Sequence, residues 1–125
     1  MWLCTQHGFY SIVRKAGDEY HIRARMKQDL VNLKALVVRD CPDASKWKIH
    51  RSVPADYRWR MVVTQPGAAL AIMALAQNID YANFKSRIHD RPDQRTKSQA
   101  YGYLWQDLHR LQNTEMTQIA NKDLL

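Results

Sequence analysis

Alternating and helix-like apolar spacings divide the chain into short elements. Segments rich in aromatic and β-branched residues, or alternating in polarity, predict strands at 2–4, 9–15, 20–26, 47–53 and 57–64. Apolar spacings of three and four residues predict helices at 27–38, 66–78, 81–88 and about 98–112. Paired strands alternating with helices predict an α+β fold: a mostly antiparallel sheet with helices packed on one face, ferredoxin-like or a permuted form of it. We expect a single α+β domain at 1–112 and a C-terminal tail at 113–125 that is irregular or a frayed helix.

Residues 9–26 predict a β-hairpin. With a four-residue loop at 16–19, Val13 lies opposite Ile22 and Phe9 opposite Met26, so that apolar side chains stack across the hairpin. In this register the other face carries Tyr10, Ile12, Arg14, His21, Arg23 and Arg25. The strand at 57–64 alternates in the same way, with Tyr57, Trp59, Met61 and Val63 inward and Arg58 and Arg60 outward.

Arginines thus gather on the sheet face that the helices leave open. Arginine offers a planar, permanently charged donor group that suits phosphate, and an aromatic ring among arginines can stack on a base. The candidate anion-binding or nucleic-acid-binding residues are Tyr10, Arg14, His21, Arg23, Arg25, Arg58 and Arg60.

The composition favours the same class of ligand. The chain has 125 residues, with 19 Lys and Arg against 12 Asp and Glu, which gives a formal net charge of +7. An excess of this kind favours nucleic acid, nucleotides, anionic lipid or an acidic protein surface. The prediction is a small basic binding module for polyanions, either nucleic acid or a nucleotide.

Several other classes are disfavoured. Cys4 and Cys41 are too far apart for a short zinc motif, and no two histidines lie four residues apart. No nucleophile elbow, phosphate-cradling glycine loop or dinucleotide fingerprint occurs, so we expect neither metal nor cofactor and no enzyme activity. A small phosphoesterase using His and Arg is the weakest alternative. The first residues lack a signal-peptide pattern and the longest apolar run, 68–76, is short, which predicts a cytoplasmic protein without a membrane span.

A second hypothesis is a protein–protein regulator, for example an inhibitor of a larger nucleic-acid-processing complex from a phage or mobile element. A homo-oligomer would form through helix 68–76 or the last helix, although burial of 68–76 within the fold is favoured over an interface. The last helix carries a regular stripe: Tyr101, Leu104, Trp105, Leu108 and Leu111. We expect Trp59, Tyr81, Phe84, Tyr101 and Trp105 to lie in the core.

Four segments stand out as a set: Met-Trp-Leu at 1–3 with Gly-Phe-Tyr-Ser-Ile-Val at 8–13, Ile-Arg-Ala-Arg at 22–25, Asp-Tyr-Arg-Trp-Arg at 56–60 and Asp-Tyr-Ala-Asn-Phe-Lys at 80–85. Together they resemble a widespread family of short bacterial proteins, over most of residues 1–112. The resemblance implies a bacterial or phage source and a single cytoplasmic domain, and it supplies no activity or site residue.

Overall fold

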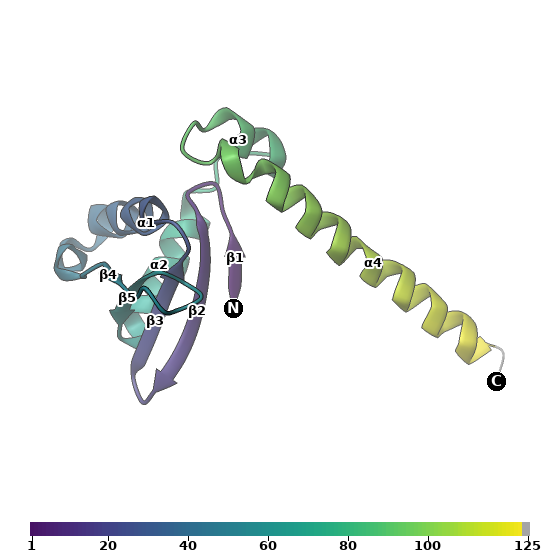
Figure 1. The fold of residues 1–125 in the computed structure, drawn as a ribbon, viewed down its shortest axis with the longest axis horizontal. Helices are drawn as coiled ribbons and strands as arrows, with labels where there is room; N and C mark the ends of the chain where they lie inside the picture. Colours follow the sequence, from purple (N-terminus) through teal and green to yellow (C-terminus); the bar gives the residue numbers. More distant parts are fainter. Residues whose placement is uncertain (124–125) are drawn as a thin grey trace.

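A five-stranded antiparallel sheet forms the centre of the computed structural model, which describes residues 1–123 (Figure 1). The strand order in the sheet is β1-β2-β3-β5-β4. The strands are β1 (Trp2–Cys4), β2 (Phe9–Ala16), β3 (Glu19–Ala24), β4 (His50–Arg51) and β5 (Trp59–Val63). The helices are α1 (Lys27–Asp40), α2 (Gln65–Gln77), α3 (Phe84–Asp90) and α4 (Ser98–Asp123), with 3₁₀ turns η1 (Pro42–Lys46) and η2 (Arg95–Lys97). The expected α+β class is confirmed.

The order of the strands is that of a permuted ferredoxin-like sheet. Strands β3 and β4 both pair antiparallel with β5, so they run parallel to each other, and α1 connects them. This is the split β-α-β unit of ferredoxin-like folds. The position beside β3 is filled by β2, which precedes β3 in a hairpin, and β1 extends the sheet at that edge.

The hairpin register differs by one residue from the prediction. Ile12 pairs with Ile22 and Ser11 with Arg23, whereas the sequence placed Val13 opposite Ile22. The reason is an irregularity in β2: Ala16 pairs with Glu19 in the predicted register, but the register shifts by one residue between Arg14 and Ala16. In the two-residue turn, Gly17 has φ +53°, a conformation that glycine adopts without steric cost.

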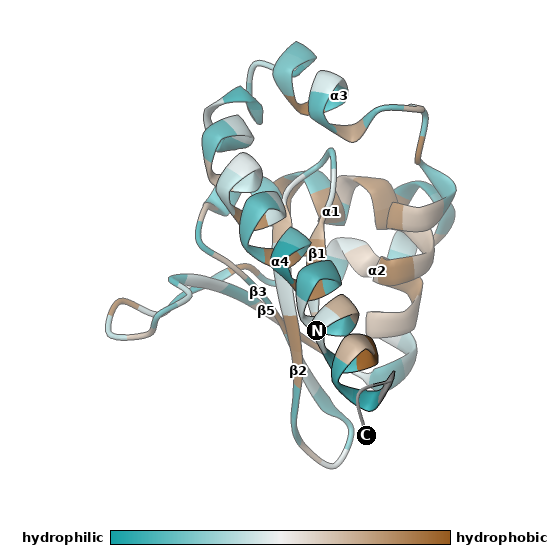
Figure 2. Ribbon diagram, turned by 90° about the vertical axis from the view of Figure 1, so that its right-hand side faces the viewer, coloured by the Kyte–Doolittle hydropathy of each residue, from teal (hydrophilic) through white to brown (hydrophobic). Residues whose placement is uncertain are grey.

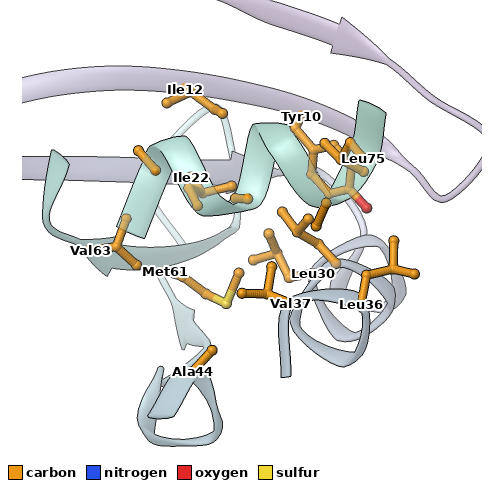
Figure 3. Close-up of a cluster of buried hydrophobic side chains, with 14 of the residues drawn as sticks. Tyr10, Ile12, Ile22, Leu30, Leu36, Val37, Ala44, Met61, Val63 and Leu75 are labelled. Carbon is orange, nitrogen blue, oxygen red and sulfur yellow. The ribbon is translucent and has the colours of Figure 1, made fainter. Parts of the chain in front are cut away.

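The core lies between one face of the sheet and helices α1 and α2, which lie side by side in both overall views (Figures 1 and 2). Tyr10 and Ile12 from β2, Ile22 from β3 and Met61 from β5 point into it together with leucines and valines of α1 (Figure 3). The buried positions of the apolar helix α2 are small, Ala68, Ala71 and Ala74 with Leu75, so this helix packs within the fold as expected. Met26 and Val53, expected inward, are 41% and 63% exposed.

A side-chain hydrogen bond and a proline mark the start of α2, where the pattern predicted a helix. The side chain of Thr64 accepts a hydrogen bond from the backbone of Gly67, and Pro66 occupies the first turn, where a missing N–H costs nothing. The segment 47–53, expected to be a strand, forms only the two-residue β4 after the turn η1.

Helix α4 leaves the body of the protein. Its first turns pack through Tyr101 on the rings of Phe9 and Phe84, and the rest extends away from the sheet (Figure 1). Every side chain from 105 to 122 is exposed, including Trp105 at 53%, which therefore is not a core residue. The expected tail is helical as far as Asp123, and its last two residues, 124 and 125, lie outside the described part. Within residues 1–123, no helix combines the length and apolar character that a bilayer crossing needs.

Candidate functional site

One row of residues crosses all five strands on the sheet face that α1 and α2 do not cover. Strand pairing aligns Trp2 with Ser11, Ser11 with Arg23, Arg23 with Arg60 and Arg60 with His50. We call this face the open face; it is defined by Trp2, Phe9, His21, Arg23 and Arg60, with Arg25 and Arg58 just beyond the strand ends. Its residues alternate with Ile22, Ala24 and Met61, which are buried in the core on the other side.

The open face brings together three of the predicted site residues on adjacent strands. His21 and Arg23 lie on β3, and Arg60 lies directly opposite Arg23 on β5. The Nη1 of Arg60 donates to Nδ1 of His21 over 3.2 Å, and Nε2 of His21 lies 2.7 Å from the carboxylate of Glu19. Because Arg60 can only donate, Nδ1 of His21 accepts and its Nε2–H faces Glu19.

Two predicted site residues do not belong to this face. Tyr10 is fully buried in the core, where its hydroxyl donates to the backbone carbonyl of Asp29 over 2.6 Å, and burial raises its pKa well above the usual value. Arg14 pairs with Tyr20 at the exposed end of the hairpin and donates through Nε to the carbonyl of Gly17. Both follow from the shifted register, which places even-numbered positions of β2 on the core side.

Tyr57 is the residue that sequence reasoning assigned to the wrong side. It is 5% exposed, yet its ring lies between two guanidinium groups, with Cζ of Arg23 at 4.5 Å and Cζ of Arg25 at 4.3 Å from its centroid. The alternation that placed it inward does not apply, because β5 begins only at Trp59. The loop before β5 thus folds onto the open face and holds the two arginines by cation–π contacts.

The arginines of the open face are only partly neutralised. Arg25 lies 3.5 Å from Asp56, an exposed pair that contributes little. Among the described residues, no carboxylate lies within ion-pair distance of Arg23, Arg58 or Arg60. Arg23 donates to the hydroxyl of Ser11 over 2.6 Å, a neutral partner, so its charge remains. The face therefore carries a net positive field.

Aromatic rings continue the open face toward β1. Trp2, 63% exposed, meets Phe9 edge to face with 5.8 Å between ring centroids. The guanidinium of Arg25 lies 6.0 Å from the Phe9 ring, which links these rings to the arginines. Exposed aromatic surface beside cationic groups is the combination on which unpaired bases stack.

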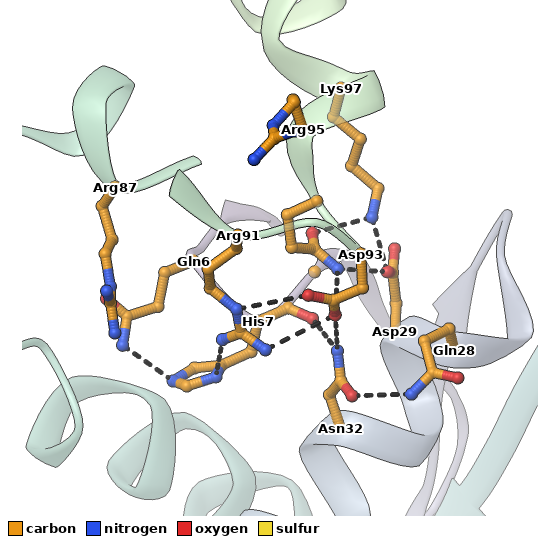
Figure 4. Close-up of polar contacts among 12 residues, drawn as sticks. Gln6, His7, Gln28, Asp29, Asn32, Arg87, Arg91, Asp93, Arg95 and Lys97 are labelled. Carbon is orange, nitrogen blue, oxygen red and sulfur yellow. Dashed lines mark hydrogen bonds and ion pairs between the residues drawn. The ribbon is translucent and has the colours of Figure 1, made fainter. Parts of the chain in front are cut away.

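A second polar cluster joins the turn between β1 and β2, helix α1 and the segment 87–97, and its members bond mainly to one another (Figure 4). The carboxylate of Asp29, a residue 1% exposed, accepts from the backbone of Phe9, from Gln94 and from Lys97, whose Nζ is 2.5 Å away. Asn32 donates to the carbonyl of His7 and to Asp93, each over 2.8 Å. These bonds attach the segment that carries α3 and α4 to α1 and to the turn between β1 and β2, which is a structural role.

The charges in this cluster are set by their surroundings. Burial, and then the neighbouring charge of Arg91, lower the pKa of His7, whose Nδ1 accepts from Arg91 over 2.8 Å. Burial alone would raise the pKa of Asp93, but hydrogen bonds from Asn32 and Gln94 and the charge of Arg91 outweigh it and hold that pKa below its usual value. No local pattern indicates this cluster, because its members lie in three separate segments, 7–9, 29–32 and 91–97.

Comparison of the chain with protein-family models, with curated proteins and with solved structures found no match.

Proposed function

We propose that this protein is a binding module, not an enzyme, and that it holds single-stranded nucleic acid against the open face of its sheet. The observation that supports this most is the direct opposition of Arg23 and Arg60 on adjacent strands, with Arg25 and Arg58 beside them and no carboxylate to neutralise three of the four. Like charges placed opposite each other in a sheet are unfavourable unless an anion binds between them.

The side chains of the open face have two roles, phosphate binding and base stacking. Arg58 is exposed and the side chain of Arg25 is 53% exposed, so these two are the phosphate contacts most accessible from solution. Arg23 and Arg60 are half-buried, and they contribute positive electrostatic potential and further hydrogen-bond donors to the face. Trp2 and Phe9 offer the rings on which one or two bases stack, at about 1–3 kcal/mol per base.

The stacking surface favours a single strand over a duplex. A duplex presents its phosphates but keeps its bases stacked on one another, so Trp2 and Phe9 would gain no partner. Single strands expose the faces of their bases. A sheet with aromatic rings beside arginines can therefore stack on the base and bind the phosphate of the same nucleotide. We therefore expect little dependence on base sequence.

The experiment is a titration of a fluorescently labelled oligothymidylate with the protein, followed by anisotropy, beside the same strand in a duplex. The wild type should bind the single strand more tightly than the duplex. The variant Arg25→Ala with Arg58→Ala should lose at least about tenfold in affinity, since each charge-assisted contact contributes over 1 kcal/mol. Trp2→Ala should weaken binding to the single strand and leave binding to the duplex unchanged.

A matched control removes the same charge from the other side of the sheet. Lys34→Ala with Arg39→Ala takes two cations from α1 and leaves the open face intact. If this control weakens binding as much as the arginine variant, the protein attracts nucleic acid by net charge alone and the open face is not its site.

A further inference from the structure

The outer part of α4 presents an apolar stripe that stays largely exposed, although Lys85 of α3 lies over the ring of Trp105 at 4.6 Å. Large side chains at five positions are between 51% and 70% exposed: Trp105, Leu108, Leu111, Met116 and Ile119. Trp105, Leu108, Met116 and Ile119 share one side of the helix with Gln112, at spacings of three and four residues, and Leu111 lies at the margin of that side. A stripe of this kind on a projecting helix marks an interaction surface.

The helix itself needs a partner to be stable. α4 has 26 residues, so it is about 39 Å long, and all side chains from 105 to 122 are exposed. Helices in proteins gain most of their stability from packing an apolar side against another surface. A second surface that covers the stripe would supply that packing.

The order of residues along the stripe is symmetric about Gln112. Trp105 and Ile119 lie seven residues before and after it, and Leu108 and Met116 lie four residues before and after it. Two antiparallel copies of such a helix, related by a two-fold axis at residue 112, match these four positions, apolar with apolar. Binding to an unrelated partner would not require the apolar positions to be symmetric about one residue.

We propose that α4 pairs with α4 of a second copy of this chain, antiparallel, in a two-fold dimer centred on Gln112. Trp105 then packs on Ile119 of the second copy, and Leu108 packs on its Met116. The interface is self-complementary, as a two-fold dimer requires, because each contact occurs twice. This inference is independent of the proposed nucleic-acid site, whose residues lie on the sheet.

The polar residue at the centre of the stripe fits the same register. The two copies of Gln112 meet on the axis, where each amide can donate to and accept from the other, and a single polar pair in an apolar seam fixes the register of paired helices. A shift by one turn would separate the two glutamines.

The size of the seam sets the expected affinity. The stretch from Trp105 to Ile119 is about 21 Å long and a helix about 10 Å wide, which is smaller than the roughly 800 Å² per partner of a standard stable interface. We therefore expect a reversible dimer with a Kd in the micromolar range. Sedimentation velocity and light scattering across that range should show a mass rising from one chain to two.

Two single variants and their combination test the register. Leu108→Glu and Met116→Lys should each shift the protein toward monomer by at least tenfold in Kd. In the double variant, Glu at 108 faces Lys at 116 of the second copy, so the dimer should return toward wild-type strength. In a parallel pair each position faces itself, and the double variant would then be at least as weak as the singles.

A matched control places a charge on the other side of the same helix. Thr117→Glu lies about half a turn from the seam and should leave the dimer unchanged, with helicity by circular dichroism as a check on folding. A wild type that stays monomeric through the micromolar range would overturn the proposal. So would a dimer that Leu108→Glu does not weaken, or a double variant that does not recover.

Discussion

Arg23 and Arg60 lie directly opposite each other on adjacent antiparallel strands, on the same open face of the sheet. Opposed like charges cost a sheet roughly 0.2–1 kcal/mol relative to neutral pairs. The structure offers neutral partners instead of a counter-charge: Arg23 donates to Ser11, and Arg60 donates to His21. The repulsion between Arg23 and Arg60 thus destabilises the free protein, and a bound anion would replace it with attraction to both guanidinium groups.

The first prediction concerns this cost. Because salt screens the repulsion between Arg23 and Arg60, the free energy of unfolding of the wild type should rise with sodium chloride concentration. Arg60→Thr removes the repulsion and places a good strand former on β5, so it should be at least as stable as the wild type at low salt. Urea unfolding at low and high salt measures both effects.

A neutral substitution on the same strand is the control for that experiment. Val62→Thr lies on the open face, two residues from Arg60, and changes no charge. Its salt dependence should equal that of the wild type. If Arg60→Thr retains the full salt dependence of the wild type, the repulsion is not the reason for it.

The second prediction concerns the buried pair of Asp29 and Lys97. Lys97→Met leaves a carboxylate that is 1% exposed without its cation, which should cost about 3 kcal/mol in the free energy of unfolding. Adding Asp29→Asn removes the stranded charge, so the double variant should be more stable than Lys97→Met alone. Additive losses in chemical denaturation would show that the two side chains do not interact.

The third prediction compares two glycines. An added Cβ at Gly8 would lie 2.5 Å from Cβ of Asp29 and 2.7 Å from the hydroxyl of Tyr10, so Gly8→Ala should cost about 2–3 kcal/mol. At Gly102 nothing lies within 4 Å, and Gly102→Ala in α4 should gain roughly 0.5–1 kcal/mol. Thermal unfolding of the two variants should move Tm in opposite directions, and a neutral Gly8→Ala would contradict the packing described.

The fourth prediction is a pH dependence from His7. Its pKa in the folded protein lies below the ordinary value of 6.5, so the unfolded chain binds more protons once the pH falls below that value. The contribution of His7 to stability is therefore complete above pH 6.5 and is lost as the pH falls from there toward the folded pKa. His7→Asn keeps an acceptor for Arg91 without the titration, and its unfolding free energy should fall less over the same interval. Equal losses in both proteins would contradict this account.

Local hydrophobic patterns predicted most elements of the fold. The apolar spacing around Leu30 and Leu33 predicted α1, and the run at 68–76 predicted a helix buried within the fold, as both are. The split unit of β3, α1, β4 and β5 followed from the order of paired strands and helices. These features depend on residues close in sequence, where periodicity is informative.

The failures come from contacts that no local pattern encodes. An irregularity in β2 between Arg14 and Ala16 moved the register by one, which took Tyr10 from the open face into the core. Tyr10 is tolerated there because its hydroxyl reaches the carbonyl of Asp29, a partner on another element. The tail was left open between an irregular segment and a frayed helix for a different reason: Gln112 and Glu115 interrupt the stripe, so the apolar spacing weakens after Leu111.

The candidate site was predicted in part. The alternation within 21–25 and 58–60 was enough to place His21, Arg23 and Arg60 on one face, as the structure has them. The stacking of Tyr57 between Arg23 and Arg25 was not predictable, since it depends on a loop folding back over the sheet.

The most direct test of the open face as a polyanion site is the salt dependence of oligothymidylate binding. Four guanidinium contacts, at about 0.7 each, predict a slope of log affinity against log salt near −3 for the wild type. Arg25→Ala with Arg58→Ala should reduce the slope to about half, while Lys34→Ala with Arg39→Ala should leave it unchanged. An affinity and slope that the arginine variant shares with the wild type would contradict the central claim.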